Sequence, residues 1–450
     1  MDWTYKPGAN GSATSLLSTY ANGSDAKYNY DYDANGNITR IWRGNTSFTN
    51  ASEKYSYVYD SANQLIRENL YYGSGNSSNA TITYEYDIWG NLLNKKIYAY
   101  TVGTLGTARE TVPYAYTNSA WKDQLTSYDG ESITYDASGN PTNYLGAALV
   151  WEGQRLKSYT PKDASSGRAN SYVYSYDENG IRTRKTIGST VTDYYYNGTL
   201  LMGTVKTTTN SDGSTTTSKL RFSYDADGKV VAVNYNGNYY YYLRNAQSDI
   251  VKLIDKTGAT VVEYRYDSWG KLLSTSGSLA STLGKNNPFR YRGYVYDEET
   301  GFYYVSSRYY DPEIGRFINA DDIAYLGMGG LTSYNLFAYC GNNPVMGYDP
   351  YGTFDWSSFG KGAGWLAIGI TAICVGVSVL TCGVAAPAMM AVAAVTVTAG
   401  ALTAVNGVSE LGEAATGHNF VRDDVFRGNE KAYDVYSNTT AAVAENRHYF

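Results

Sequence analysis

Most of the chain alternates between Tyr-rich stretches and short polar stretches that contain glycine. From about Tyr28 onward a unit recurs, in which an alternating stretch ends in Tyr-Asp, a Gly-containing turn follows, and an aliphatic stretch comes next. Successive side chains of a strand point to opposite faces, so this period-two alternation predicts half-buried strands, and each unit predicts one β-hairpin. Clear copies are Tyr28–Ile41, Tyr55–Glu68, Thr83–Lys96, Ile133–Tyr144, Tyr172–Lys185, Phe222–Val233 and Tyr264–Thr275.

The turns of these units carry strong local signals. Asn35-Gly36, Asn179-Gly180 and Asp227-Gly228 are dipeptides typical of type I′ hairpin turns. We interpret the recurring Asp of each unit as a turn and packing residue rather than a ligand. One hairpin is marginal alone, so neighbours must pair, and a long row of twisted strands must curl or close. The sequence therefore predicts a mainly β fold, an antiparallel strip over residues 1–285.

Composition narrows the function classes. The chain of 450 residues has 49 Tyr against 11 Phe. This excess suits sheets whose faces are partly exposed to solvent, because each Tyr ring carries a hydroxyl that needs water or a polar partner. Charged residues make up 17% and the net charge is −6. A nucleic-acid-binding surface would need clusters of Lys and Arg, and the chain has none that we find. We therefore expect no nucleic-acid partner.

The residues available for catalysis are mainly carboxylates. Cys340, Cys374 and Cys382 form no metal-binding pattern and no disulfide framework, and the only histidines are His418 and His448. Histidine-based chemistry is therefore excluded from the first 417 residues. We expect neither a metal nor a cofactor.

Residues 286–352 differ from the repeats. Turn-forming residues recur in Asp311-Pro312, Asn342-Asn343-Pro344 and Asp349-Pro350-Tyr351-Gly352, with aromatic runs between them. The segment reads GYVYDEETGFYYVSSRYYDPEIGRFINADD and later LFAYCGNNPVMGYDPYG. It closely resembles the core-associated domain of Rhs/YD-repeat proteins, whose pattern is GxYYDxETGLYYxxxRYYDPxxGRFxxxDP followed by YxYxxNNPxxxxDPxG. The family includes polymorphic, wall-associated toxins and is related to the Tc-toxin C component and teneurin shells.

This resemblance implies an architecture. The YD-repeat strip over residues 1–285 spirals into a hollow β-shell, and the Rhs core domain, residues 286–352, plugs or caps one end. Residues 353–450 then form a variable C-terminal region. The shell is an implication of the resemblance, whereas the strip follows from the residues themselves.

The resemblance also implies a self-cleavage site. In the family, two core aspartates form an aspartic-protease-like pair that cuts just after the final DPxG. By position these are Asp321 and Asp349, with Arg316 as a supporting cation, and the cleavage region is Gly352, Thr353 and Phe354. Two close carboxyl groups share one proton, which suits this chemistry.

Three departures from the family pattern bear on that site. Asp321 is followed by Asp322-Ile323-Ala324 instead of Pro-x-Gly, so Asp322 is an alternative to Asp321. A glycine-rich insert at 326–330 lengthens the spacing, and Thr353 stands where the family has Leu. Asp311 is interpreted as a turn residue.

The C-terminal region has a different composition. No charged residue occurs from Gly362 to Ser409, and Pro387 divides two apolar runs, Trp365–Val384 and Ala388–Val408. A bilayer-spanning helix needs about 20 apolar residues, so residues 363–408 predict an apolar helical hairpin. Three interpretations stay open: transmembrane helices, a buried hairpin in a soluble domain, and cargo held inside the shell.

Two functions compete. The first is the C-terminal part of a secreted Rhs-type toxin, whose partners are its own C-terminal region as encapsulated cargo, an immunity protein, and a membrane through 363–408. The alternative is a cell-surface adhesion protein whose Tyr-rich strands bind carbohydrate; a structural relic without activity is a third. Met1–Pro7 has no apolar signal region, so we expect a fragment of a secreted or cell-surface protein whose signal lies elsewhere.

Overall fold

A computed structural model describes residues 2–7, 13–21, 27–163, 170–226, 228–322 and 334–353. The chain divides into two compact units. In the smaller unit, β1 (Asp2–Pro7) pairs with β2 (Ala13–Ala21), whose last two residues belong to the larger unit. The predicted apolar hairpin at 363–408 and Phe354 of the cleavage region lie outside the described residues. Among the helices that the structure does describe, none is long and apolar enough to cross a membrane.

The larger unit, residues 20–323 and 335–353, contains one long antiparallel strip. From β3 to β24, consecutive strands of the sequence pair antiparallel. This confirms the predicted antiparallel β fold. The strands are β3 (Lys27–Tyr32), β4 (Ile38–Arg43), β5 (Lys54–Tyr59), β6 (Leu65–Tyr71), β7 (Ala80–Tyr86), β8 (Leu92–Ala99), β9 (Glu110–Ala115), β10 (Ser127–Tyr128), β11 (Glu131–Tyr135), β12 (Pro141–Tyr144), β13 (Ala147–Glu152), β14 (Arg155–Thr160), β15 (Tyr172–Tyr176), β16 (Arg182–Ile187), β17 (Thr190–Asn197), β18 (Leu200–Thr209), β19 (Thr215–Tyr224), β20 (Val230–Tyr235), β21 (Asn238–Arg244), β22 (Ile250–Ile254), β23 (Thr260–Tyr266) and β24 (Leu272–Ser276).

The turns at Asn35-Gly36 and Asn179-Gly180 are not of type I′, so that prediction is wrong for these two, and Asp227 of the third lies outside the described residues. Gly36 has φ +83°, but Asn35 is not among the residues with positive φ, as a type I′ turn would require. The Asp33 carboxylate decides the geometry, because its Oδ1 accepts the backbone N–H groups of Asn35 and Asn37, each at 2.9 Å. Gly36 N–H donates to the Asp33 carbonyl at 3.1 Å. The result is a type I turn closed by a glycine bulge, and Asn179-Gly180 repeats it with φ +82° at the glycine.

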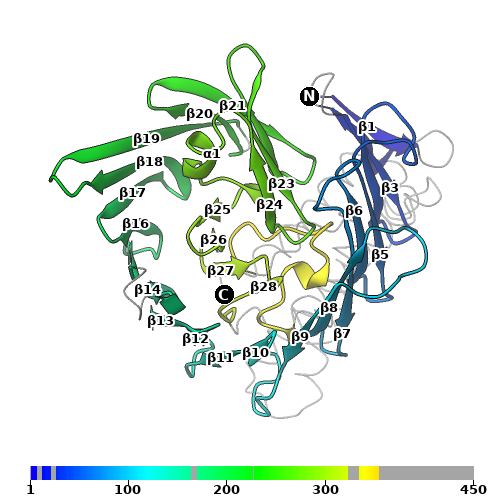
Figure 1. Cartoon of the computed structure of the whole chain (residues 1–450), viewed down its shortest axis with the longest axis horizontal. Helices are drawn as coiled ribbons and strands as arrows, with labels where there is room; N and C mark the ends of the chain where they lie inside the picture. The colour runs from blue at the N-terminus through cyan, green and yellow to red at the C-terminus, as the bar shows by residue number, and fades with distance from the viewer. Residues whose placement is uncertain are drawn as a thin grey trace, which may run out of the picture. The chain divides into compact units, whose positions relative to one another are not determined.

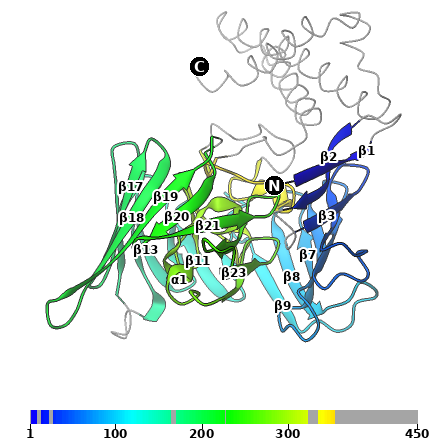
Figure 2. The ribbon, with the colours of Figure 1, turned by 90° about the horizontal axis from the view of Figure 1, so that it is seen from above.

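The rest of this unit, residues 283–322 and 335–353, follows the strip and is called the core segment. It holds α1 (Leu283–Asn286), η3 (Tyr291–Gly293), η6 (Cys340–Asn342) and a four-stranded sheet of β25 (Val295–Tyr296), β26 (Tyr303–Val305), β27 (Arg308–Asp311) and β28 (Arg316–Phe317). Tyr303, Tyr310 and Tyr339 have no measurable exposure. Figure 1 shows the strip curving around this segment, and the turned view in Figure 2 again places it between β3–β9 and β13–β20.

Asparagines of the core segment bind successive repeat turns. In four turns, the amide side chain four residues after the Asp donates to that Asp carboxylate: Asn37, Gln64, Asn91 and Asn140. Three of these amides also accept a hydrogen bond from the core segment through their own oxygens. The pairs are Asn343 with Asn37 at 3.0 Å, Asn342 with Gln64 at 2.8 Å and Asn335 with Asn91 at 2.8 Å. These hydrogen bonds therefore fix the position of the core segment against three consecutive repeats.

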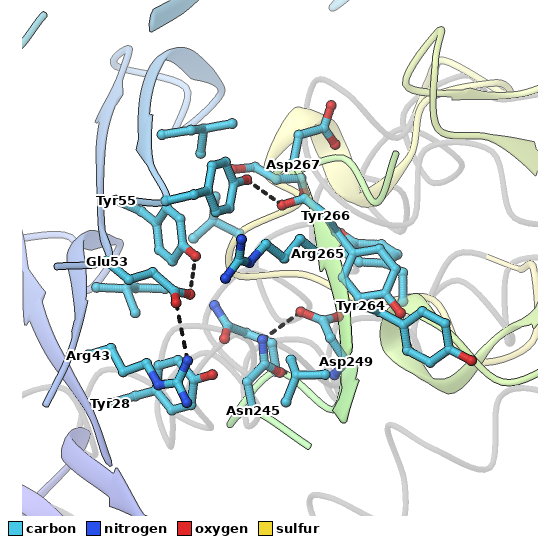
Figure 3. A pocket seen from close by; sticks show the side chains of 18 of the residues that line it. Tyr28, Arg43, Glu53, Tyr55, Asn245, Asp249, Tyr264, Arg265, Tyr266 and Asp267 are labelled. Carbon is cyan, nitrogen blue, oxygen red and sulfur yellow. Dashed lines mark hydrogen bonds and ion pairs between the residues drawn. The ribbon is translucent and has the colours of Figure 1, made fainter. Parts of the chain in front are cut away.

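Side chains from the early and the late strands of the strip line one pocket, to which Arg43, Glu53 and Asp249 contribute charged groups (Figure 3). Tyr72 on the β6 side donates its hydroxyl to the Tyr266 carbonyl of β23 at 2.6 Å. Arg43 Nη1 lies 3.3 Å from Glu53 and 3.9 Å from Glu263. These contacts join segments that are far apart in the sequence, so side chains link the region from β4 to Tyr72 with β23 near the end of the strip.

Candidate active site

The structure brings the two predicted aspartates together on one cation. Arg308 Nη2 lies 2.9 Å from Asp321 Oδ2 and 3.2 Å from Asp349 Oδ2. All three side chains are buried, with exposed fractions of 3%, 7% and 6%. Because both carboxylates contact the same nitrogen atom, they form a close pair that is shielded from bulk water.

Strand pairing in the core segment places Asp321 there. Arg316 forms an antiparallel bridge with Ala338, and Phe317 N–H donates to the Phe337 carbonyl at 3.0 Å. The segment that ends at Tyr339 thus returns beside β28. Asp321 lies four residues after Phe317, and its N–H donates to the Leu336 carbonyl of the returning segment at 3.0 Å.

The peptide group between Gly352 and Thr353 is held on both sides. The Gly352 carbonyl accepts hydrogen bonds from Arg308 Nε and from Ser307 Oγ, the latter at 2.8 Å. On the other side, Thr353 N–H donates to Asp349 Oδ1 at 3.1 Å. The guanidinium that joins the two aspartates therefore also polarises the carbonyl at the predicted cleavage region.

Gly352 fits this position because it lacks a side chain. Its φ is +70°, and a Cβ atom would lie 2.2 Å from the Val305 carbonyl oxygen and 2.8 Å from Ser307 Oγ. Both the left-handed backbone and the close approach of β26 require glycine. The final Gly of the DPYG turn is therefore what lets the chain approach Arg308.

Burial raises the pKa of Asp349 to about 6. Arg308 opposes that rise by favouring the ionised carboxylate, and the neighbouring charge of Asp321 adds to it. A carboxyl group with this pKa holds its proton for part of the time near neutral pH. Such a pair can present one acid and one base, which is the arrangement that aspartic proteolysis uses.

The cation at the pair is Arg308 and not Arg316, the residue inferred from the family pattern. Arg316 instead contacts the Tyr116 hydroxyl at 3.1 Å and the Asp123 carbonyl at 2.7 Å. Sequence reasoning missed Arg308 although it stands inside the RYYDP motif, four residues upstream of Pro312. Arginine is suited to this place because its fork can bind several oxygens at once.

The other carboxylates of the region lie elsewhere. Asp322 is exposed whereas Asp321 is buried, so the difference in burial distinguishes the two residues. Asp311 accepts the Glu313 N–H at 2.8 Å and the Tyr144 hydroxyl at 2.8 Å, which is the turn role expected for it. Within the described ranges, no group of three or more His, Cys, Asp or Glu residues could hold a metal ion. A catalytic role for Asp321 and Asp349 stays a prediction.

Comparison with known proteins agrees with this architecture. Residues 209–345 match the family model named Teneurin YD-shell. The tRNA3(Ser)-specific nuclease WapA of Bacillus spizizenii and the tRNA nuclease WapA of Bacillus subtilis are each 38% identical over 235 residues, or 52% of this chain and 10% of the relative. The chain thus spans about a tenth of these relatives' length.

A solved structure shares the fold. The TcdB2-TccC3-Cdc42 crystal structure matches 78% of this chain and 18% of its own, with a TM-score of 0.61 and 22% identity. The repeated hairpins and the enclosed core segment define a YD-repeat shell. The chain is therefore similar to YD-repeat shell proteins in part of its sequence and shares their shell fold.

Proposed function

We propose that this chain is the shell and core of an Rhs-type toxin that cuts itself next to Gly352. Its similarity to the WapA nucleases and to the TcdB2-TccC3 shell supports the toxin assignment. The observation that carries the self-cleavage proposal is the peptide group of Gly352 and Thr353, which lies between Arg308 and Asp349.

The geometry favours hydrolysis of the Gly352–Thr353 bond. The ionised carboxylate of the pair takes a proton from a water molecule, and the resulting hydroxide attacks the Gly352 carbonyl carbon. Arg308 Nε stabilises the charge that develops on the carbonyl oxygen. The carbon–nitrogen bond then breaks, and the Thr353 nitrogen leaves as an amine after accepting a proton from the pair. Asp349 already contacts that nitrogen through Oδ1.

The remainder of the proposal concerns what the cut releases. The proposed division is a shell strip over residues 1–285, a core over 286–352 and a C-terminal region over 353–450, which is held as cargo and freed from the chain by the cut. The protein acts outside the producing cell or at its surface, an immunity protein protects the producer, and residues 363–408 contact a membrane. The tRNA cleavage in the relatives' names belongs to those proteins, and no target is assigned to this C-terminal region.

The decisive experiment is intact-mass analysis of freshly purified protein. We expect a fragment ending at Gly352 from the wild type and one uncut chain from Asp321→Asn and from Asp349→Asn. Asp322→Asn is the matched control, since this exposed neighbour should leave the cut unchanged. A fragment ending at Thr353 would move the cut by one bond and keep the pair. An uncut wild-type chain, or cleavage in both mutants, would refute the proposal.

Carbohydrate binding is a second candidate, supported by one surface feature. Tyr195 and Tyr239 are 55% and 57% exposed, and strand pairing aligns them at the two ends of a row that crosses β17 to β21 through Gly203, Arg221 and Asn234. Exposed Tyr rings beside Arg and Asn side chains suit stacking and hydrogen bonding to a sugar. Binding on a glycan array that disappears in Tyr239→Ala would support this function.

A further inference from the structure

The peptide group of Leu336 connects the strip with the aspartate pair. Its N–H donates to Asp123 Oδ2 at 3.0 Å, and its carbonyl accepts Arg308 Nη1 and the Asp321 N–H, each at 3.0 Å. Asp123 lies in the strip, in the connection between β9 and β10. The Asp123 carboxylate thus holds the Leu336 peptide group, whose carbonyl in turn accepts hydrogen bonds from Arg308 and Asp321 of the candidate site.

Asp123 is itself held in place by the core segment. Arg316 Nη2 donates to the Asp123 carbonyl at 2.7 Å and to Asn335 Oδ1 at 3.2 Å. Asn335 in turn donates to Asn91 of the strip at 2.8 Å. Residues 335 and 336 are therefore tied to two separate parts of the strip, and Arg316 belongs to this connection rather than to the aspartate pair.

We propose that Asp123 is a positioning residue for the self-cleavage reaction and makes cutting depend on a correctly docked shell. This inference rests on the self-cleavage proposed above. Arg308, Asp321 and the cleavage region all belong to the core segment, but the Leu336 carbonyl that orients two of them is anchored by the strip. Before the β9–β10 connection docks, Leu336 lacks that anchor and the pair lacks its fixed geometry. Small misplacements of catalytic groups are costly to rate.

The test follows cleavage in time as the full chain is made by cell-free translation with a labelled amino acid. Asp123→Leu removes the acceptor at similar size, and we expect it to cut at least roughly tenfold more slowly than the wild type. Asp123→Asn keeps an oxygen that can accept the Leu336 N–H, so its rate and pH profile should stay close to the wild type. Rescue by Asn distinguishes positioning from proton transfer, which an amide cannot perform.

The outcomes separate this inference from the function on which it rests. An uncut wild-type chain refutes self-cleavage itself. If the wild type is cut and Asp349→Asn is not, then cleavage of Asp123→Leu at the wild-type rate refutes the role of Asp123. Loss of cleavage in Asp123→Asn would also overturn positioning. If Asp123→Leu shows no cooperative melting transition, Asp123→Ala, which opens the same hydrogen bond with a smaller side chain, is measured by the same criteria.

Discussion

Arg182 of the strip and Asp297 of the core segment form a two-pronged ion pair in which neither side chain is exposed. Arg182 Nη1 lies 2.5 Å from Asp297 Oδ2, and Nη2 lies 2.9 Å from Oδ1. Lys185 Nζ adds a third contact to Oδ1 at 2.9 Å. Because the two segments are far apart in the sequence, this pair fixes the core segment against β16.

We predict that removing one member of this pair destabilises the protein strongly. Arg182→Met leaves the buried Asp297 with Lys185 alone, and a broken buried pair costs about 3–5 kcal/mol. Urea unfolding should show this loss, and a double-mutant cycle with Asp297→Asn should recover part of it. Lys162→Met is the control, because Lys162 and Glu131 are 62% and 52% exposed and such pairs contribute at most about 1 kcal/mol.

Arg308→Lys should abolish or greatly slow self-cleavage while the chain still folds. A lysine ammonium cannot contact both carboxylates and the Gly352 carbonyl with a planar fork. Loss of one donor to a developing oxyanion typically costs about 10²–10³ in rate, and we expect an effect of that order. Cleavage is measured by intact mass over time. Arg40→Lys, at an arginine that is 54% exposed, should cut like the wild type.

Self-cleavage should be faster at pH 5.5 than at pH 8. The pair needs one protonated carboxyl group, and burial raises the pKa of Asp349 to about 6, so its proton is lost as the pH rises through that value. Refolding the denatured full chain in buffers of different pH and following the fragment by mass checks this. A rate that stays constant from pH 5.5 to 8 would argue against Asp349 as the acid.

The stability of the fold should fall as the pH rises towards 8. Burial, followed by the neighbouring carboxylate of Glu68, raises the pKa of Asp267 to about 8. The folded state therefore favours the protonated acid. This stabilisation is complete below the ordinary Asp pKa of about 4 and is lost as the pH passes through the raised value.

Urea unfolding across this pH range in the uncut Asp349→Asn background measures that loss. Asp267→Asn should flatten the decrease in unfolding free energy, because an amide does not ionise. Asp60→Asn changes the equivalent turn residue of another repeat and should keep the slope of the background protein. Equal slopes in all three proteins would show that Asp267 is not the source.

Gly352→Ala should prevent self-cleavage. The added methyl group would lie 2.2 Å from the Val305 carbonyl oxygen, so the chain would move away from Arg308. Gly198→Ala is a matched control, since Gly198 also has a positive φ, +58°, but no atom lies within 4 Å of the position that a Cβ would take there. Intact mass should show an uncut chain for the first variant and normal cutting for the second.

The sequence by itself determined the strip and, through a motif, proposed the two aspartates, with Asp322 still an alternative to Asp321. Alternation along each unit decides which side chains share a face, and this is a local property that a sequence displays directly. The turn type was not predictable from the dipeptide alone. Asn35-Gly36 indicated type I′, whereas the carboxylate of Asp33, two residues before Asn35, imposes a type I turn with a glycine bulge. Asp321 and Asp349 came from a motif, which is also local.

Only the tertiary structure decided which arginine contacts Asp321 and Asp349. Arg308 and Arg316 stand at different positions of the β27–β28 hairpin, where Arg316 pairs with Asp311 near the turn. Which of them meets the aspartates depends on segments that return from elsewhere in the chain, so spacing along the sequence carried no signal for it. The same holds for Asp123, whose partner Leu336 is distant in sequence. Local periodicity fixes faces and turns, whereas contacts between distant segments arise only when the strip and the core segment pack together.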